Sequence, residues 1–214
     1  MSSSLESRLQ AAIRERCPAG RVLVAIDGED GAGKTVLADR LASHLVTAGE
    51  PVLRASIDGF HRPRAERYAR GRSSPEGFYR DSYDLDAFRR ELIDPFRRGV
   101  PVRTAVFDVR ADAPVRTTPQ ATPVDCVLIV DGIFLHRPEL RGLWDWSLWL
   151  EVATTERFAR MAARDDTDPD PTHPGNLRYL VGQQLYRAEA GPEGLADAVV
   201  DNTDHAHPVV VRGC

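Results

Sequence analysis

The segment from Gly28 to Thr35, GEDGAGKT, has the residue types and spacing of a loop that binds phosphate groups. It fits the pattern G-x-x-x-x-G-K-[ST], in which glycines allow backbone N–H groups to turn toward a phosphate without a steric clash. In such a loop the Lys34 ammonium reaches the outer phosphates of a nucleotide, and the Thr35 hydroxyl binds Mg²⁺. The predicted nucleotide-binding residues are Gly28, Asp30, Gly31, Ala32, Gly33, Lys34, Thr35 and Val36.

The segments around this loop favour a phosphate site over an ordinary glycine-rich turn. An apolar, β-branched run at 22–26 precedes the loop, and Leu37, Leu41 and Leu45 follow it at helical spacing. Strand, loop and helix in this order are the context that the motif requires, because the helix N-terminus adds partial positive charge. Lys34 is also the only lysine of the chain, beside 27 arginines, which suits a site that needs a compact ammonium.

Three further groups could complete the chemistry of phosphoryl transfer, which needs a metal ligand, a proton acceptor and cations around the transferred phosphate. Asp131 ends an unbroken apolar run and is predicted to bind Mg²⁺ together with Thr35. Asp58 ends another apolar run and is predicted to accept a proton from the attacking hydroxyl or to bind the metal through water. Three arginines with helical spacing are predicted to close over the phosphates as part of a lid: Arg157, Arg160 and Arg164.

Each of these groups has a structural alternative. Asp131 and Asp58 each precede a glycine and could simply form a turn. The three arginines could be the solvated face of a helix. The phosphate-binding loop favours the functional interpretation, because ligands of parallel sheets bind where the carboxyl ends of the strands converge.

Apolar segments of strand length alternate with segments of helical periodicity along the chain. The alternation predicts an α/β fold of the P-loop NTPase type, a three-layer sandwich with a mostly parallel central sheet, in one domain over 1–214 with a lid near 157–178. The strand that ends at Asp58 should lie beside the strand that leads into the loop, and Phe107 should end a further strand. The predicted strands cover 22–26, 51–57, 102–107, 126–130, 147–152, 198–200 and 209–211, and the predicted helices include 84–98 and 176–190.

Composition argues against several other classes of protein. The net charge of −4 gives no basic field for nucleic acid, and no apolar run approaches the roughly 18 residues of a membrane helix. The N-terminus lacks the apolar core of a signal peptide. Cys17, Cys126 and Cys214 are far apart and are expected to be reduced thiols. We therefore expect a cytoplasmic protein that binds small molecules, with no nucleic-acid or membrane partner, and we leave a homo-oligomer open.

From about 22 to 202 the chain resembles the uridine kinase, phosphoribulokinase and pantothenate kinase group of P-loop kinases, and most of all the uridine kinases. Besides the loop, the motifs that carry the resemblance are Asp58-Gly59-Phe60-His61, Tyr83-Asp84-Leu85-Asp86-Ala87-Phe88, Phe107-Asp108, Asp131-Gly132-Ile133, the lid pattern Arg157, Arg160, Arg164 and Asp165, and later Arg178-Tyr179 with Gln183 and Ala196-Asp197.

The resemblance implies a kinase that transfers the γ-phosphate of ATP, with Mg²⁺ as cofactor, to a hydroxyl of a small metabolite, most of all a nucleoside such as uridine. It implies Asp58 as the base for the substrate hydroxyl and Asp84 as a partner of substrate hydroxyls. With the loop, the predicted catalytic residues are Lys34, Asp58, Arg160 and Arg164, and the predicted metal ligands are Thr35, Asp131 and Asp58. The predicted substrate-binding residues are Asp58, His61, Tyr83, Asp84, Phe107, Arg157 and Gln183.

The chain departs from uridine kinases at two positions that contact the uracil ring in that family. His61 stands where they carry a tyrosine, and the stretch directly after Asp108, Val109-Arg110-Ala111-Asp112, contains no histidine. The lid also lacks their Arg-Gly-Arg. Kinases of pantothenate, a sugar phosphate or a nucleoside monophosphate therefore stay as alternatives, as does a P-loop ATPase that is not a kinase. A GTPase is excluded, because its Asn-Lys-x-Asp motif would need a second lysine. The string from Asp30 to Thr35 also resembles thymidylate kinases, whose Asp-Arg motif is not evident here.

Overall fold

The structure is a computed structural model that describes residues 4–213. Its main strands are β1 (Arg21–Gly28), β2 (Val52–Ser56), β5 (Cys126–Gly132), β6 (Trp146–Glu151), β7 (Ala198–Asp201) and β8 (Val209–Arg212), and a separate hairpin consists of β3 (Phe107–Asp108) and β4 (Ala113–Pro114). The helices are α1 (Leu5–Arg16), α2 (Lys34–Thr47), α3 (Arg64–Arg67), α4 (Pro75–Asp81), α5 (Leu85–Phe88), α6 (Asp94–Arg98), α7 (Thr154–Asp165), α8 (Leu177–Ala190) and α9 (Pro192–Leu195). A π-helical segment (Arg89–Ile93) joins α5 to α6, and short 3₁₀ turns cover Ile57–Phe60 and Pro138–Leu140.

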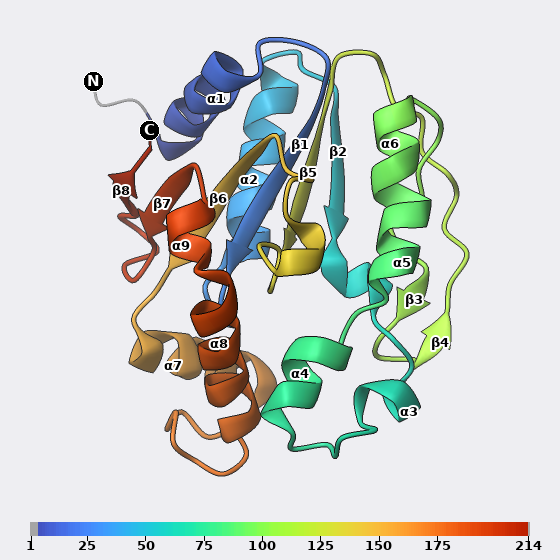
Figure 1. Cartoon of the computed structure of the whole chain (residues 1–214). Coiled ribbons are helices and arrows are strands. Elements are labelled where there is room, and N and C mark those ends of the chain that lie inside the picture. Colours follow the sequence, from blue (N-terminus) through green and yellow to red (C-terminus); the bar gives the residue numbers. More distant parts are fainter. Residues whose placement is uncertain (1–3, 214) are drawn as a thin grey trace.

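The main strands form one sheet in the order β2-β5-β1-β6-β7-β8, and helices cover both of its faces (Figure 1). Neighbouring strands are parallel except for β7 and β8. Every residue of β5 is buried, as expected for a central parallel strand. The predicted α/β fold, a three-layer sandwich with a mostly parallel sheet, is therefore confirmed.

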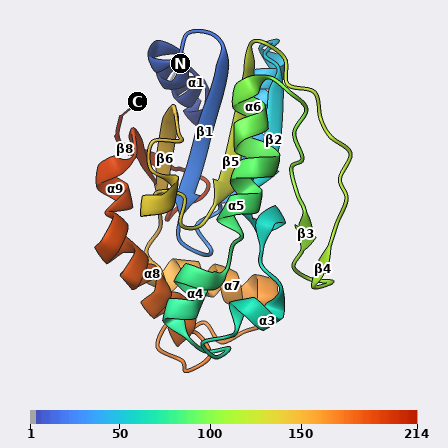
Figure 2. The ribbon, with the colours of Figure 1, turned by 45° about the vertical axis from the view of Figure 1, so that its right-hand side comes forward.

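Side chains of β1 alternate between two hydrophobic cores. Val22, Val24 and Ile26 pack with α1 and α2 on one face, while Leu23 and Ala25 pack with α4 to α6 and α8 on the other. The carboxyl ends of β1, β2 and β5 meet at one edge of the sheet, where α3, α4, α7 and α8 gather (Figure 2). A ligand that binds at the strand ends therefore lies between the sheet and these helices.

Two expectations about the sheet are wrong. The strand that precedes Asp58, β2, pairs with β5 and not with β1, so one strand separates it from the phosphate-binding loop. Residues 102–107 are not a strand of the sheet: Val102 forms a single bridge to Gln120, and Phe107 belongs to the β3–β4 hairpin. The alternating side chains of this segment have strand propensity, but no strand of the sheet lies beside it to form a ladder.

The predicted helix over 84–98 is interrupted. A π-helical segment lies between α5 and α6, and Pro95 stands at the start of α6. Proline has no N–H to donate to the preceding turn, so a regular helix cannot run through it. In residues 4–213, no helix combines the length and apolar character that crossing a membrane requires. Cys17 and Cys126 are free thiols, while Cys214 lies outside the described residues.

Candidate active site

The phosphate-binding loop connects the end of β1 to the first turn of α2. Gly31 and Gly33 adopt φ angles of 76° and 89°, which glycine reaches without strain. A Cβ at Gly31 would lie 2.5 Å from the carbonyl oxygen of Arg157, so this turn also needs glycine for space. The Lys34 ammonium donates to the carbonyl of Glu29 over 2.8 Å. The loop thus has the compact form that the motif predicts, with Lys34 held across it.

Thr35 and Asp131, two of the three predicted metal ligands, are in direct contact. The Thr35 hydroxyl donates to Asp131 Oδ2 over 2.6 Å, and Arg54 Nη2 lies 3.0 Å from Asp131 Oδ1. Asp131 lies within β5, paired with Ser56, and does not form the turn that was the alternative. Hydroxyl and carboxylate oxygens suit Mg²⁺, which binds one or two protein groups and takes its other ligands from phosphates and water. The described residues contain no cluster of three or more His, Cys, Asp or Glu side chains that could hold a metal alone.

Asp58 lies in the 3₁₀ turn that directly follows β2. The Ser56 hydroxyl caps this turn by accepting from the Asp58 N–H. The Tyr83 hydroxyl donates to Asp58 Oδ1 over 2.8 Å, and His61 Nδ1 lies 2.9 Å from the Asp58 carbonyl oxygen. The rings of His61 and Tyr83 are in contact, with centroids 4.6 Å apart. The structure therefore brings three predicted site residues together, with Tyr83 on the carboxylate of Asp58 and His61 on its main-chain carbonyl.

The electrostatics of this group are consistent with a shared site. Burial, together with the charges of Asp58, Asp30 and Asp131, raises the pKa of the Tyr83 hydroxyl well above its ordinary value. Tyr83 thus stays protonated and donates to Asp58. Burial lowers the pKa of His61, so its ring is neutral near pH 7. Three carboxylates, from the phosphate-binding loop, the turn after β2 and β5, thus act on the same tyrosine, as expected where strand ends converge.

Three other predicted residues have different surroundings. Asp84 caps α5 by accepting from the Ala87 N–H over 2.8 Å. The fully buried Gln183 donates to Asp30 Oδ2 over 2.7 Å, which ties α8 to the phosphate-binding loop. Phe107 is buried in the hairpin, and its strand β3 contacts the 3₁₀ turn that contains Asp58.

The three arginines of α7 do three different things. Arg157 is buried, with Nη2 3.2 Å from Glu29 Oε2 and Nη1 donating to the Asp30 carbonyl. Arg160 donates to the carbonyls of Asn202 and Thr203. Arg164 is two-thirds exposed and pairs with Asp165 over 2.7 Å. The hydrogen bonds that Arg164 donates to Asp165, with the charges of Asp165, Asp30 and Asp58, raise the Arg164 pKa.

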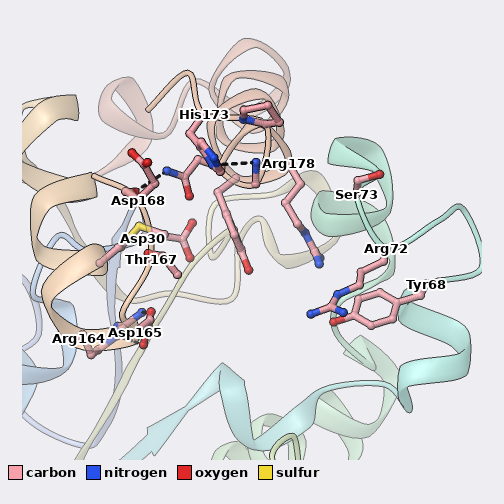
Figure 3. A pocket seen from close by; sticks show the side chains of 15 residues that line it. Asp30, Tyr68, Arg72, Ser73, Arg164, Asp165, Thr167, Asp168, His173 and Arg178 are labelled. Atoms are coloured by element: carbon pink, nitrogen blue, oxygen red, sulfur yellow. Dashed lines mark hydrogen bonds and ion pairs between the residues drawn. The ribbon is translucent and has the colours of Figure 1, made fainter. Parts of the chain in front are cut away.

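Two cavities flank the phosphate-binding loop. The larger, of about 710 Å³, extends from Asp30 and Arg164 to Tyr68, Arg72 and Arg178 under the segment 165–176 (Figure 3). The smaller, of about 330 Å³, is lined by the first turn of α2, Arg160 and residues after β7. Arg157 lines neither of these two cavities, and its polar contacts are with Glu29 and Asp30 of the phosphate-binding loop.

Sequence reasoning missed a buried network directly before the loop. Asp27, at the end of β1, accepts from the Gly28 N–H, from His136 Nδ1 over 2.7 Å and from the Tyr186 hydroxyl. These contacts join β1, the segment after β5 and α8 beneath the phosphate-binding loop. An aspartate inside the apolar run VLVAIDG was the one signal for it. Sequence reasoning also missed Arg54, which forms an ion pair with Asp131. The available signal was again a charged residue within a strand, here β2.

Comparisons with known proteins show which proteins this chain is similar to in sequence and in fold. No protein-family model matches the chain. The chain is similar to the uridine kinase of Leuconostoc citreum, with 23% identity over 165 residues that cover 77% of this chain and 76% of the relative.

Two solved structures share the fold over most of the chain. One is a possible uridine kinase from Bacillus stearothermophilus, with a TM-score of 0.67 and 24% identity, covering 90% of this chain and 98% of that one. The other is a Silicibacter sp. protein provisionally described as a fructose transport system kinase, with a TM-score of 0.70 and 26% identity, covering 88% and 96%.

Proposed function

We propose that this chain, which belongs to the uridine kinase-like group of P-loop kinases, transfers the γ-phosphate of ATP to a hydroxyl of a small metabolite. The observation that carries the proposal is the convergence of three elements at one sheet edge. The phosphate-binding loop, the Thr35–Asp131 pair and the Asp58–Tyr83 pair all lie there. A phosphate cradle, a metal site and a proton acceptor are the parts that phosphoryl transfer needs.

Each of these residues has a task that follows from its contacts. Lys34 exchanges its hydrogen bond to the Glu29 carbonyl for phosphate oxygens, where its charge stabilises the transferred group. Asp58 accepts the proton of the attacking hydroxyl, and Tyr83 holds Oδ1 so that Oδ2 faces the acceptor. Arg164 supplies positive charge from the lid side. A bound Mg²⁺ would be held by Thr35 and Asp131 and would neutralise phosphate charge.

The smaller cavity is the proposed site of the nucleotide base. It adjoins Gly33 and Val36 of the phosphate-binding loop and helix, and Arg160, Asn202 and Pro208 form its other walls. Asn202 also donates to the Ala32 carbonyl over 2.8 Å, so this wall is fixed to the loop. A base placed here would direct its phosphates along the loop toward Lys34.

The acceptor is a hydroxylated metabolite, and a nucleoside is the first candidate because of the similarity to uridine kinases. The names of the similar proteins, uridine kinase and fructose transport system kinase, refer to different small molecules. A neutral His61 beside Tyr83 is compatible with either a base or a sugar. Kinases of pantothenate or a sugar phosphate therefore remain the alternatives, and we propose that the reaction takes place in the cytoplasm.

Asp58→Asn tests the proposed kinase chemistry. If Asp58 is the base, turnover with the best acceptor should fall on the order of 10²–10⁴-fold, while the affinity for ATP stays within a few-fold. The assay is ADP release with ATP–Mg²⁺ and a panel of nucleosides, pantothenate, ribulose 5-phosphate and other sugars. Asp86→Asn, on the exposed side of α5, is the matched control. ADP release that no acceptor stimulates would favour an ATPase, and retained turnover in Asp58→Asn would contradict the role of Asp58.

A further inference from the structure

The larger cavity has two ends of different charge. At the end beside the phosphate-binding loop, Arg164 is paired with Asp165, and Asp30 accepts from Gln183. At the other end, the lining residues are Tyr68, Arg72, Ser73 and Arg178. Figure 3 shows the side chains of Arg72 and Arg178 directed from opposite walls toward Tyr68. No acidic side chain is among the lining residues at that end.

The two arginines at this end have no carboxylate to balance them. Within residues 4–213, neither Arg72 nor Arg178 belongs to any ion pair. Most arginines near them are paired, as Arg70 is with Asp81 and Arg67 with Asp112. Two uncompensated guanidinium groups that face one cavity create a positive potential there.

Arg178 is held in place by aromatic rings. Its guanidinium carbon lies 5.3 Å from the centroid of Tyr68 and 5.2 Å from those of Phe78 and Tyr179. Its Nε is buried and has no hydrogen-bond partner. Stacking, together with a hydrogen bond to the Tyr68 hydroxyl, fixes the plane of the guanidinium, and a planar guanidinium can bind a carboxylate or phosphate through two hydrogen bonds. The side chain is therefore preorganised for an anion.

The pKa of Tyr68 is shifted in the direction that a positive potential at this end of the cavity produces. Burial alone would raise the pKa of its hydroxyl, but the hydrogen bond and charge of Arg178, with the charges of Arg67 and Arg72, outweigh burial and lower it. A negative charge is thus favoured at the position between the two arginines.

We propose that the acceptor carries an oxyanion, either a carboxylate or a phosphoryl group, which Arg72 and Arg178 bind while its hydroxyl reaches Asp58. Asp58 is not among the residues that line this cavity, but Arg164 lines it and lies close enough to Asp58 for the charge of that carboxylate to raise the Arg164 pKa. The inference rests on the proposed function and narrows its substrate class from any hydroxylated metabolite to an anionic one. A cavity of about 710 Å³ is large enough for a small phosphorylated or carboxylated metabolite beside the phosphates of ATP. A neutral nucleoside would leave both arginines without a partner.

The test compares anionic acceptors with neutral partners in which a hydroxyl or hydroxymethyl group replaces the phosphate or carboxylate. Ribulose 5-phosphate and ribulose, pantothenate and pantothenol, and uridine monophosphate and uridine form three such pairs. We expect the anionic member of at least one pair to be phosphorylated with a kcat/KM roughly 100-fold or more above its neutral partner, since charge-assisted bidentate contacts discriminate strongly. Arg72→Gln and Arg178→Gln should raise the KM of that acceptor on the order of 10–10³-fold and change the KM of ATP by less than about threefold. Arg98→Gln, an exposed arginine on α6 outside both cavities, should leave both constants unchanged.

A binding measurement complements the assay. With the nucleotide site filled by a non-hydrolysable ATP analogue, inorganic phosphate should raise the melting temperature of the wild type and of Arg98→Gln but not of Arg178→Gln. Arg178→Lys keeps the charge but loses the planar stack and should bind phosphate more weakly than the wild type. Efficient phosphorylation of uridine with unchanged KM in Arg72→Gln and Arg178→Gln would overturn the inference and leave the proposed kinase intact. ATP turnover that no acceptor stimulates would refute the proposed function itself, and the inference with it.

Discussion

Replacing Arg157 by methionine should destabilise the fold strongly, because it leaves Glu29 buried beside the phosphate-binding loop. The side chains of Arg157 and Glu29 are 2% and 8% exposed, and Nη2 lies 3.2 Å from Oε2. Removing one member of a buried ion pair costs about 3–5 kcal/mol. Arg187 lies 3.7 Å from the same Glu29 oxygen and compensates part of the charge. Burial also raises the pKa of Glu29, so protonation can neutralise some of it.

We therefore expect Arg157→Met to lower the free energy of unfolding by about 2–4 kcal/mol, which corresponds to a melting temperature roughly 4–16 °C lower for a domain of this size. Thermal and urea denaturation, followed by circular dichroism, measure this. Arg164→Met on the same helix is the matched control: its ion pair with Asp165 is exposed, so the expected loss is below about 1 kcal/mol.

A double-mutant cycle separates the ion pair from simple loss of packing. Glu29→Gln combined with Arg157→Met removes both charges, so the double variant should lose less stability than the sum of the two single variants. Additive losses, or an Arg157→Met variant as stable as Arg164→Met, would refute the structural role. Arg157 would then be free to act on substrate, as its place in the lid pattern implies.

Three further outcomes follow from the site and its surroundings. Lys34→Arg should fold normally but lose turnover on the order of 10²–10³-fold, because a planar fork does not replace a point charge among phosphate oxygens; near-normal turnover would contradict the predicted role of Lys34. Backbone amides in 165–175 should exchange hydrogen more slowly when a bisubstrate analogue is bound, and equal exchange in both states would exclude a closing lid. Burial opposes ionisation of Glu50, but hydrogen bonds from Arg14 and Gln10 outweigh it and lower its pKa. The ionised Glu50 should therefore add about 1 kcal/mol to the free energy of unfolding at pH 7, and this contribution should disappear as the pH falls below 4.5. The free energies of unfolding of Glu50→Gln and the wild type, measured as a function of pH, should then become equal in acid.

The parts of the fold that local sequence determines were predicted well. Residues 21–47 form a strand, a glycine loop and a helix because each element has its own signal in adjacent residues. The order of strands has no such signal: β2 lies beside β5 through pairs such as Ser56 with Asp131, which are 75 residues apart. Segment 102–107 illustrates the same limit, because strand propensity yields a strand only where a partner is available.

The same limit applies to the candidate site, where residues with a local sequence signal could be predicted and contacts between distant segments could not. The sequence could predict that Thr35 and Asp131 share a metal site, because each has a local signal. Thr35 follows the lysine of the phosphate-binding motif, and Asp131 ends an apolar strand. The spacing of Arg157, Arg160 and Arg164 could not show that Arg157 is the one with a buried side chain. The adjacent Phe158 and Met161 were the available signal, because they lie on the buried face of α7 and carry Arg157 with them. The joint action of Tyr68, Arg72 and Arg178 depends on contacts between α8 and the segment before α4, and no motif encodes it.

The hydrogen bond between Lys34 and the Glu29 carbonyl has a consequence for covalent modification of the chain. Since Lys34 is the only lysine, every reagent or enzyme that acylates lysine side chains must act at the phosphate-binding loop or not at all. Acetylation there would remove the ammonium that the loop holds in place. Phosphates of a bound nucleotide would shield the same nitrogen from the reagent. The extent of lysine acylation, measured on the intact protein, thus equals the fraction of molecules whose nucleotide site has been chemically inactivated.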